Sequence, residues 1–346
     1  MILHQADSTQ QHIWIKDISE NDAVKGCYLV NKKSSGTTRR GEPFLSLILS
    51  DRTGEVEAKV WDRAEELTPL FHEADIIEII GNAGSYRDRI QLRISQIRVP
   101  DGEIDPGIFL ESTTADISSM MNSLRQILLE VNNTYLRKLI DMFLGDRQFV
   151  SMLKKAPAAK NFHHCYLGGL LEHTLSVCRI ARMVADHYPQ LDKDLLITAA
   201  FLHDIGKIKE FKFDHQIEYT DEGRLIGHIV LSVAMLSDKL VEFRNFPEDL
   251  AIKLKHMILS HHGQYEFGSP KRPKILEAFA LHMVDDLDAK MTGINRMLQR
   301  DNREGSWTDF NRLFERYLLK GEVFALQNKS DENQRKEEKQ QRLFSI

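Results

Sequence analysis

The chain of 346 residues contains few cysteines and no long apolar run. Its three cysteines, Cys27, Cys165 and Cys178, are odd in number and lack the spacing of a metal finger, so we expect reduced thiols. No apolar run reaches the roughly 18 residues of a membrane-spanning helix. The first residues lack a basic flank followed by an apolar stretch, so no secretory signal is expected. These absences indicate a cytoplasmic protein without a membrane segment.

The chain also lacks an excess of positive charge. Its formal net charge of −5 excludes a globally basic protein that coats nucleic acid, but it does not exclude a local basic groove. Histidine has a skewed distribution, because 11 of the 14 histidines fall between His163 and His282. Neutral imidazole is the commonest protein ligand for metals, so this clustering indicates a metal or acid–base site.

The first hundred residues have the pattern of a small β-structure. Residues 55–61 alternate apolar and charged side chains with period two, and 51–54 (DRTG) read as a turn. A short helical piece at 64–71 lies between the third and fourth expected strands. The five expected strands cover residues 25–31, 43–50, 55–61, 76–80 and 90–99. This order matches a five-stranded Greek-key barrel of the OB type, which we expect to form a nucleic-acid-binding domain over 1–100.

The pattern then changes from strand to helix. Residues 100–107 are rich in turn formers, and 118–144 place apolar residues at helical spacing. We expect a linker and connecting helices over 101–155 and an all-α domain over 156–325, helical to about 320, with loops at 206–221 and 262–273. The charged residues 326–346 are expected to be a tail. The predicted fold class is therefore multi-domain α and β, with the barrel followed by the helical domain.

The most informative motif is the adjacent pair His203 and Asp204. The pair ends an apolar helix that breaks at Gly206. A carboxylate in that position faces the negative end of the helix dipole and loses hydration, so it requires a cation. His173 and a later aspartate would complete one set of ligands, and Asp204 would bridge to a second ion held by His228 and His261. Lys207, three residues after Asp204, is expected to contact a phosphate.

Mixed imidazole and carboxylate ligands without thiolate favour Mn²⁺, Fe²⁺, Co²⁺, Ni²⁺ or Zn²⁺ over Mg²⁺ or Ca²⁺. Two such divalent ions would hold a hydroxide and neutralise phosphate oxygens during an in-line displacement.

The order of these motifs resembles that of the HD superfamily of metal phosphohydrolases. More narrowly, the segments NFHHCYLGGLLEHT, FLHDIGKI, EYTDEGRLIGHI and LSHHGQYEFGSP behind an OB-like barrel resemble the YhaM family of 3′-to-5′ exoribonucleases, over about residues 12 to 320. The resemblance implies an exonuclease that acts on single-stranded RNA, with single-stranded DNA as a second substrate class, commonly with Mn²⁺. It implies a first metal bound by His173, His203, Asp204 and Asp285, and a second bound by Asp204, His228 and His261.

Several assignments stay open at this level. His261 and His262 are adjacent, and we prefer His261 as the ligand. Asp285, Asp286 and Asp288 share one expected helix; Asp285 is preferred as the ligand, and Asp288 is expected to pack or to support a ligand. Three further histidines are candidate substrate contacts, with helix capping as the structural alternative for the first two: His163, His164 and His262.

The barrel segment has basic loops and aromatic residues on or beside its expected strands. Such barrels bind single strands by attraction of the backbone and stacking of the bases. Phe44 and Trp61 are expected in the core. The candidate nucleic-acid contacts are Tyr28, Lys32, Lys33, Arg39, Arg40, Tyr86 and Arg87. The structural alternative is a solvated loop with all aromatics in the core.

The leading hypothesis is a metal-dependent 3′-to-5′ exoribonuclease that releases nucleoside 5′-monophosphates by attack of a metal-activated hydroxide, with Asp204 and Lys207 as its catalytic residues. One alternative is an HD phosphohydrolase of a small nucleotide or cyclic dinucleotide, with a regulatory barrel. The other is a non-catalytic single-strand-binding protein; the presence of all six expected ligands argues against it.

Overall fold

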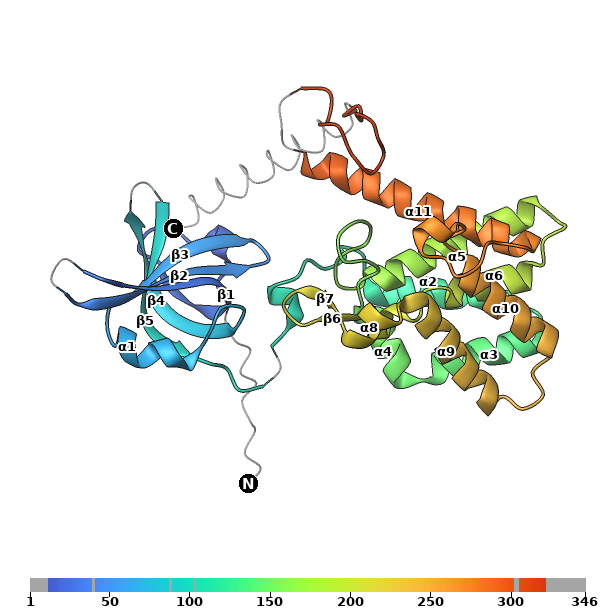
Figure 1. Cartoon of the computed structure of the whole chain (residues 1–346), viewed down its shortest axis with the longest axis horizontal. Coiled ribbons are helices and arrows are strands. Elements are labelled where there is room, and N and C mark those ends of the chain that lie inside the picture. The colour runs from blue at the N-terminus through green and yellow to red at the C-terminus, as the bar shows by residue number, and fades with distance from the viewer. Residues whose placement is uncertain (1–11, 39–40, 87–88, 103, 302–304, 322–346) are drawn as a thin grey trace, which may run out of the picture.

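The computed structural model describes residues 12–38, 41–86, 89–102, 104–301 and 305–321. A β-barrel forms the N-terminal part and a helical domain forms the rest, with a connecting segment between them (Figure 1). Each part has its own cluster of buried apolar side chains. Among the described residues, no helix is both long and apolar enough to cross a membrane.

The barrel is closed by five strands in the order β1-β2-β3-β5-β4. Only β3 and β5 pair in parallel; the other neighbours are antiparallel. The strands are β1 (Ala23–Thr37), β2 (Pro43–Asp51), β3 (Gly54–Val60), β4 (Ile76–Tyr86) and β5 (Arg89–Arg98). Between β3 and β4 lie the short helices α1 (Ala64–Leu67) and η2 (Thr68–Leu70), and η1 (Ile15–Asp17) precedes β1. The predicted OB-type barrel, with its helix after the third strand, is confirmed.

The strands alternate between the barrel interior and solvent. In β2, Leu45, Leu47 and Leu49 are fully buried, whereas their neighbours Phe44 and Ser46 are only partly buried. Two strands are longer than predicted: β1 continues through the polar residues 32–37, paired with β2, and β4 continues to Tyr86, paired with β5. No residue of the β1 extension is buried, so its pairing with β2 holds these polar residues in the sheet.

The helical domain begins after a connecting segment that contains η3 (Pro106–Ile108). The long helices are α2 (Ile117–Leu128), α3 (Thr134–Gly145), α4 (Arg147–Lys155), α5 (Gly169–His187), α6 (Lys193–Leu202), α9 (His228–Glu242), α10 (Glu248–Ser260) and α11 (Leu276–Arg300). Shorter elements are α7 (Lys207–Glu210), the hairpin of β6 (Phe211–Phe213) and β7 (Ile217–Tyr219), α8 (Asp221–Leu225) and η4 (Tyr265–Phe267). The segment 206–221, predicted as a loop, therefore contains a helical turn and a hairpin.

Polar caps explain where several helices begin. The helical periodicity over 118–144 divides into α2 and α3, because the side chain of Asn133 accepts hydrogen bonds from the backbone N–H groups of Tyr135 and Leu136. Asp194 in turn accepts from the backbone N–H groups of Asn132 and Asn133, which ties this boundary to the start of α6.

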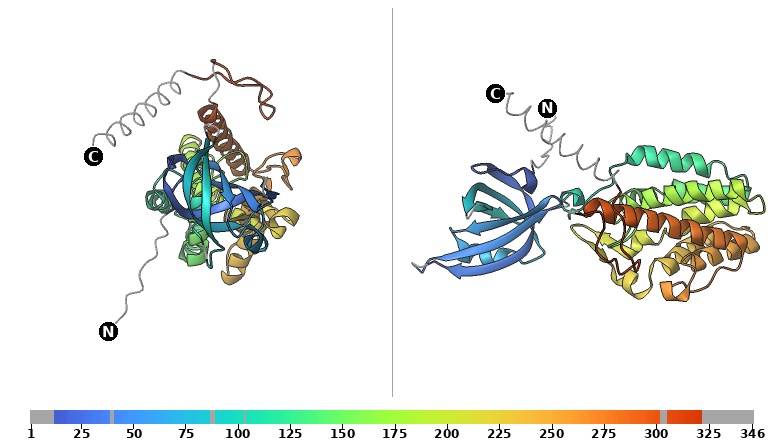
Figure 2. Two further views of the ribbon diagram at one scale, coloured as in Figure 1. Left: turned by 90° about the vertical axis from the view of Figure 1, so that its left-hand side faces the viewer. Right: turned by 90° about the horizontal axis from the view of Figure 1, so that it is seen from above.

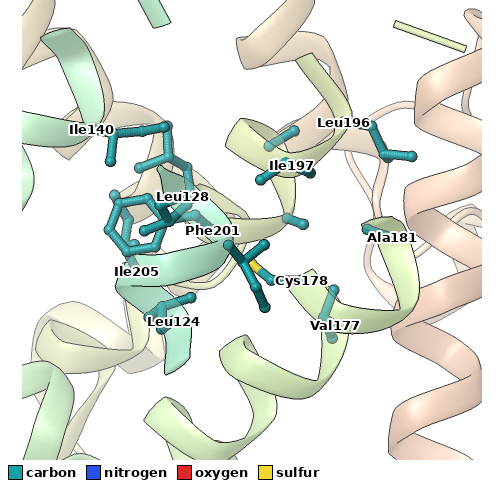
Figure 3. Close-up of a cluster of buried hydrophobic side chains, with 14 of the residues drawn as sticks. Leu124, Leu128, Ile140, Val177, Cys178, Ala181, Leu196, Ile197, Phe201 and Ile205 are labelled. Carbon is teal, nitrogen blue, oxygen red and sulfur yellow. The ribbon is translucent and has the colours of Figure 1, made fainter. Parts of the chain in front are cut away.

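Helices α5 and α6 form the centre of the helical domain. All residues of α6 from Leu195 to Leu202 are buried, so this helix is apolar on every side. Figure 3 shows its residues Leu196, Ile197 and Phe201 together with Val177 and Cys178 of α5 and with side chains of α2 and α3. A rigid core therefore surrounds the helix that ends in the His203–Asp204 pair.

Past α11, the described residues 305–321 contain no helix. Residues 305–321 form turns joined by isolated bridges between Trp307 and Leu319 and between Asn311 and Arg316. The expectation of helix to about residue 320 is wrong, because the apolar residues of this segment lack the continuous spacing of a helical stripe. The predicted tail, 326–346, lies outside the described residues.

Asp51 at the end of β2 is a buried carboxylate that fastens the start of the barrel. It accepts hydrogen bonds from the backbone N–H groups of Ile15 and Thr53, from the Thr53 hydroxyl and from His12 Nε2. Burial raises the pKa of Asp51, but the hydrogen bonds from His12, Thr53 and Ile15 outweigh it and lower that pKa below its ordinary value.

We therefore expect Asp51→Asn to lower the free energy of unfolding by about 2 kcal/mol near neutral pH, because an amide cannot accept all these donors. A carboxylate whose pKa is lowered by folding stabilises the folded state at pH values above its unfolded pKa of about 3.9. This stabilisation is lost as the pH falls below that value. The difference between wild type and variant should shrink below that pH. Thermal unfolding followed by tryptophan fluorescence measures it, with Asp62→Asn at an exposed position as control. An equally large loss in both variants would contradict this role.

Candidate metal centre

Five helices bring the predicted metal ligands together at one place. His173 lies in α5, and the His203–Asp204 pair follows α6 directly. His228 is the first residue of α9, and His261 follows the last residue of α10. Asp285 lies on α11. Since three of these positions are helix ends, the site is built where the helices converge.

The first group of ligand atoms surrounds the Nε2 atom of His173. This atom lies 3.2 Å from His203 Nε2, 3.3 Å from Asp204 Oδ2 and 3.2 Å from Asp285 Oδ1. All four residues are buried. Each offers one ligand atom within 4.8 Å of the others, which is close enough to hold one ion.

A second group lies on the other side of Asp204. His228, His261 and His262 each offer a nitrogen within 4.8 Å of the others. Asp204 Oδ1 lies 3.5 Å from both His228 Nε2 and His261 Nε2. Asp204 therefore directs one carboxylate oxygen at each group. His261 and His262 both reach the second group, and His261 is the one that also approaches Asp204.

The imidazoles of both groups are held through their Nδ1 atoms. His203 Nδ1 donates to the carbonyl of Ala200 at 2.8 Å, and His261 Nδ1 donates to the carbonyl of Ile258 at 2.7 Å. His262 Nδ1 likewise lies 2.8 Å from the Phe267 carbonyl. Because Nδ1 carries the proton in these bonds, the Nε2 lone pair is free to bind a metal.

Carboxylates hold the other two imidazoles. Asp288 Oδ2 lies 2.7 Å from His173 Nδ1, and Ser176 and His164 also contact Asp288. Glu210 Oε1 accepts from both the backbone N–H group of His228, at 2.9 Å, and its Nδ1 atom, at 3.0 Å. Glu210 was not identified from the sequence. Its position three residues after Lys207, on the helical turn that faces α9, becomes apparent only in the fold.

Several buried polar atoms of the site lack a protein partner. Asp204 Oδ1, His228 Nε2 and His261 Nε2 have no hydrogen-bond partner among the described residues. Leaving such atoms unpaired costs roughly 1–3 kcal/mol each, and more for a charged group. All three point at one another, and imidazole nitrogen with carboxylate oxygen is a donor set for divalent transition metals. The residues present therefore fit a metal.

The electrostatics of the site also favour a cation. Burial would raise the pKa of Asp204, but Lys207 and His203 lower it well below the ordinary range. Burial likewise would lower the pKa of His173, yet the carboxylates of Asp204, Asp285 and Asp288 raise it well above its usual value. The carboxylates remain charged inside the protein and attract positive charge.

Lys207 lies inside the site and not on a solvated loop. It is buried, and its Nζ atom is 2.5 Å from Asp204 Oδ2.

The three aspartates of α11 lie on different faces of the helix. Asp285 and Asp288 contact His173, whereas Asp286 pairs with Lys290 at 2.7 Å, away from the metal ligands.

The two predicted substrate histidines before α5 differ in their surroundings. His164 Nε2 lies 3.2 Å from Asp288, so this imidazole belongs to the support of His173. His163 is placed beside His173, with a distance of 5.5 Å between the ring centroids. Burial, together with the charges of Lys207 and His173, lowers the pKa of His163 to about 3. A neutral imidazole thus borders the metal site.

One predicted nucleic-acid contact of the barrel, Tyr28, is corrected by the structure, and a second, Lys33, already has partners within the barrel. Tyr28 is fully buried and donates a hydrogen bond to the Ile13 carbonyl, so its ring cannot stack on a base. Lys33 donates its Nζ protons to the carbonyls of Thr68 and Phe71, which leaves this ammonium engaged within the barrel. Of the other predicted contacts, Lys32 and Tyr86 are exposed, and Arg39, Arg40 and Arg87 lie outside the described residues.

The expectation that Phe44 and Trp61 are core residues is wrong for Trp61. Trp61 is 41% exposed, and its ring lies 5.0 Å from that of the partly buried Phe44. Lys59 Nζ lies 5.3 Å from the Phe44 ring centroid, and the exposed Arg93 is the register partner of Lys59 across β3 and β5. The residues Phe44, Lys59, Trp61 and Arg93 form an aromatic and basic patch on the outer barrel surface, which we call the barrel patch.

The two supporting carboxylates predict separable effects on metal binding. Glu210→Ala should weaken the ion held by His228 by about 10- to 100-fold, and Asp288→Asn should do the same for the ion held by His173, because each loses the group that orients its imidazole. Calorimetric titration of chelator-treated protein with Mn²⁺ measures both. Glu218→Gln on the neighbouring hairpin is the control. Unchanged binding of both ions in both variants would exclude this orienting role.

Comparisons with known proteins agree with this architecture. The HD domain family, of metal-dependent phosphohydrolases, matches residues 170–290, and the family described as an OB-fold nucleic acid binding domain matches residues 28–100. The 3′-5′ exoribonuclease YhaM of Bacillus velezensis is 37% identical over 92% of this chain and 96% of its own. YhaM of Bacillus subtilis is 36% identical over 87% and 92%.

Solved structures of OB-fold domains are also similar to part of this chain. The second OB-fold domain of replication protein A from Methanococcus maripaludis is 17% identical, with a TM-score of 0.22, over 27% of this chain and 98% of its own. The full-length relatives and the HD domain carry the assignment. The chain is a hydrolase of the HD superfamily and belongs to the YhaM family of 3′-5′ exoribonucleases.

Proposed function

We propose that this protein hydrolyses single-stranded RNA from its 3′ end and releases nucleoside 5′-monophosphates, using two divalent metal ions. The observation that carries the proposal is the position of Asp204, which directs one oxygen at each of two groups of imidazole nitrogens. A carboxylate shared by two adjacent ion sites is typical of centres that act on phosphodiesters. The YhaM relatives are named 3′-5′ exoribonucleases, which supports the direction of attack and RNA as the substrate.

Metal ions at these two positions would act as Lewis acids that activate water and neutralise phosphate oxygens. The proposed first ion is held by His173, His203, Asp204 and Asp285, and the second by Asp204, His228 and His261, with His262 as an additional ligand or substrate contact. The mixed nitrogen and oxygen donors support Mn²⁺ as the working ion, with Co²⁺, Fe²⁺, Ni²⁺ and Zn²⁺ as substitutes.

The chain's own residues would prepare the phosphate for attack. Lys207 is already held against Asp204, so its ammonium can turn to a non-bridging oxygen of the scissile phosphate and stabilise the charge that develops there. His163 has a depressed pKa and lies next to His173, so it can accept a hydrogen bond from the 3′-terminal nucleotide as a neutral imidazole. The backbone and carboxylate bonds to each Nδ1 keep the ligand imidazoles from rotating.

The barrel patch would bind the single strand ahead of the metal site. Bases stack on the Phe44–Trp61 pair, and Lys59 and Arg93 attract the backbone. The exposed Lys32 and Tyr86 remain candidate contacts. Because stacking is tolerant of sugar type, single-stranded DNA would serve as a weaker second substrate. The same proposal assigns the enzyme to the cytoplasm, where the thiols of Cys27, Cys165 and Cys178, none of which forms a disulfide, stay reduced.

Replacing the shared carboxylate should separate turnover from binding. We expect Asp204→Ala to lose at least about 10³-fold in turnover, because both ion sites lose a ligand and the phosphate loses its activated water. Strand affinity should remain within a few-fold of wild type. The assay follows 5′-labelled single-stranded RNA in Mn²⁺ as a ladder that shortens from the 3′ end, with and without chelator.

Asp286→Ala is the matched control, because Asp286 lies on the same helix as Asp285 but outside the site. A ladder that survives the chelator, or an Asp204→Ala variant with wild-type turnover, would overturn the two-ion proposal. Hydrolysis of mononucleotides or cyclic dinucleotides in place of RNA would favour a small-nucleotide phosphohydrolase. RNA binding by wild type without any hydrolysis would favour a strand-binding protein.

A substitution in the barrel patch should instead weaken strand binding and leave turnover at the metal centre unchanged. Trp61→Ala should weaken binding of single-stranded RNA by roughly 10- to 100-fold, because stacking contributes about 1–3 kcal/mol per base. Hydrolysis of a small chromogenic phosphodiester should not change, because the metal centre is untouched. Fluorescence anisotropy in the presence of chelator measures the affinity. Leu70→Ala, at another exposed apolar side chain of the barrel, is the control; equal losses in both variants would contradict a stacking role.

A further inference from the structure

The outer face of α11 carries a row of exposed apolar side chains. Their exposed fractions lie between 47 and 66%. They are spaced three or four residues apart, so they form one stripe along the helix. The α11 stripe consists of Leu276, Phe279, Met283, Leu287 and Met291.

The inner face of the same helix already packs against the helical domain and the metal site. Leu281 and Val284 are buried in the core of the helical domain, and Asp285 and Asp288 contact His173. A helix that is apolar on both faces is typical of a position between two layers of protein. In the view from above, α11 lies across the near side of the helical domain (Figure 2, right). The second layer is therefore to be sought outside the described part of this chain.

Further apolar side chains are exposed beyond the C-terminal end of the stripe. The segment 305–321, which we call the arm, folds against this end of the helix, where Asn311 contacts Met297 (Figure 1). Its large apolar side chains are between 49 and 64% exposed. On the arm they are Trp307, Phe310, Leu313, Tyr317 and Leu319.

The size of this surface is that of a protein interface. A large apolar or aromatic side chain offers about 150–250 Å² when fully exposed, so the stripe and the arm together present on the order of 1,000 Å². Monomeric proteins rarely expose a contiguous apolar patch larger than about 300–600 Å². A stable dimer buries about 800 Å² on each partner. The area therefore suffices for a homodimer.

We propose that a second copy of this chain packs on the α11 stripe, with the two α11 helices antiparallel across a two-fold axis near Met283. A uniform apolar stripe is complementary to itself, as a two-fold interface requires. The antiparallel arrangement brings the arm of one copy to the N-terminal end of α11 in the other, so the apolar side chains of the arm are covered as well. Asp285 faces the opposite side of α11, so the metal centre of each copy stays open.

Charged substitutions of Met283, beside the proposed two-fold axis, test this arrangement on the full-length chain. Wild type should sediment with twice the mass of one chain across a dilution series. Met283→Glu and Met283→Lys should each be monomeric, because the two-fold axis places like charges face to face without water. An equimolar mixture of the two variants should recover the dimeric mass, because the opposite charges then meet. Glu and Lys both favour helix, so α11 should persist in both variants.

Val241→Glu is the matched control, because Val241 is exposed on α9, away from α11. This variant should remain dimeric. A monomeric wild type overturns the proposal, and self-association that appears when residues 322–346 are removed would identify those residues as the occupant of the stripe. An oligomer that Met283→Glu leaves intact places the interface elsewhere. Variants that stay monomeric when mixed exclude the pairing of Met283 with its own copy.

Discussion

The charge of one buried carboxylate, Asp204, is the constraint on which the rest of the site depends. Its position at the C-terminal end of an apolar helix removes it from water and sets it against the helix dipole. Such a charge requires cations on both sides, and Lys207 satisfies only one oxygen. The helices α5, α9, α10 and α11 converge so that imidazoles and a second carboxylate surround it. The apolar core around α6 then keeps that convergence rigid.

Two kinds of hydrogen-bond acceptor orient the imidazoles of the site. Backbone carbonyls orient His203, His261 and His262, so these imidazoles depend on the exact ends of α6 and α10 and on the turn after them. Side-chain carboxylates orient His173 and His228, which lie within or at the start of a helix, where the nearby carbonyls are already used. The local chemistry of each helix end therefore dictates which support is available.

The sequence predicted the barrel and the order of the metal motifs because both depend on local patterns. It was less successful with single side chains in the barrel. Period two identifies which residues share a face, but Tyr28 lies in a run in which several consecutive residues are buried, so alternation could not assign its side. Trp61 directly follows β3, where the alternation ends, and Lys33 folds back on η2, a contact between residues distant in the chain.

The sequence by itself determined the strand periodicity, the helix that ends in His203–Asp204 and the residue types suited to a divalent ion. These features follow from side-chain alternation, helix breakers and donor chemistry, all of which act between near neighbours. Only the tertiary structure decided that Asp204 lies between two groups of imidazoles, that Glu210 orients His228, and that α11 has an uncovered apolar face. Each of these depends on the distance and direction between elements far apart in sequence, which packing of the core sets and local pattern does not contain.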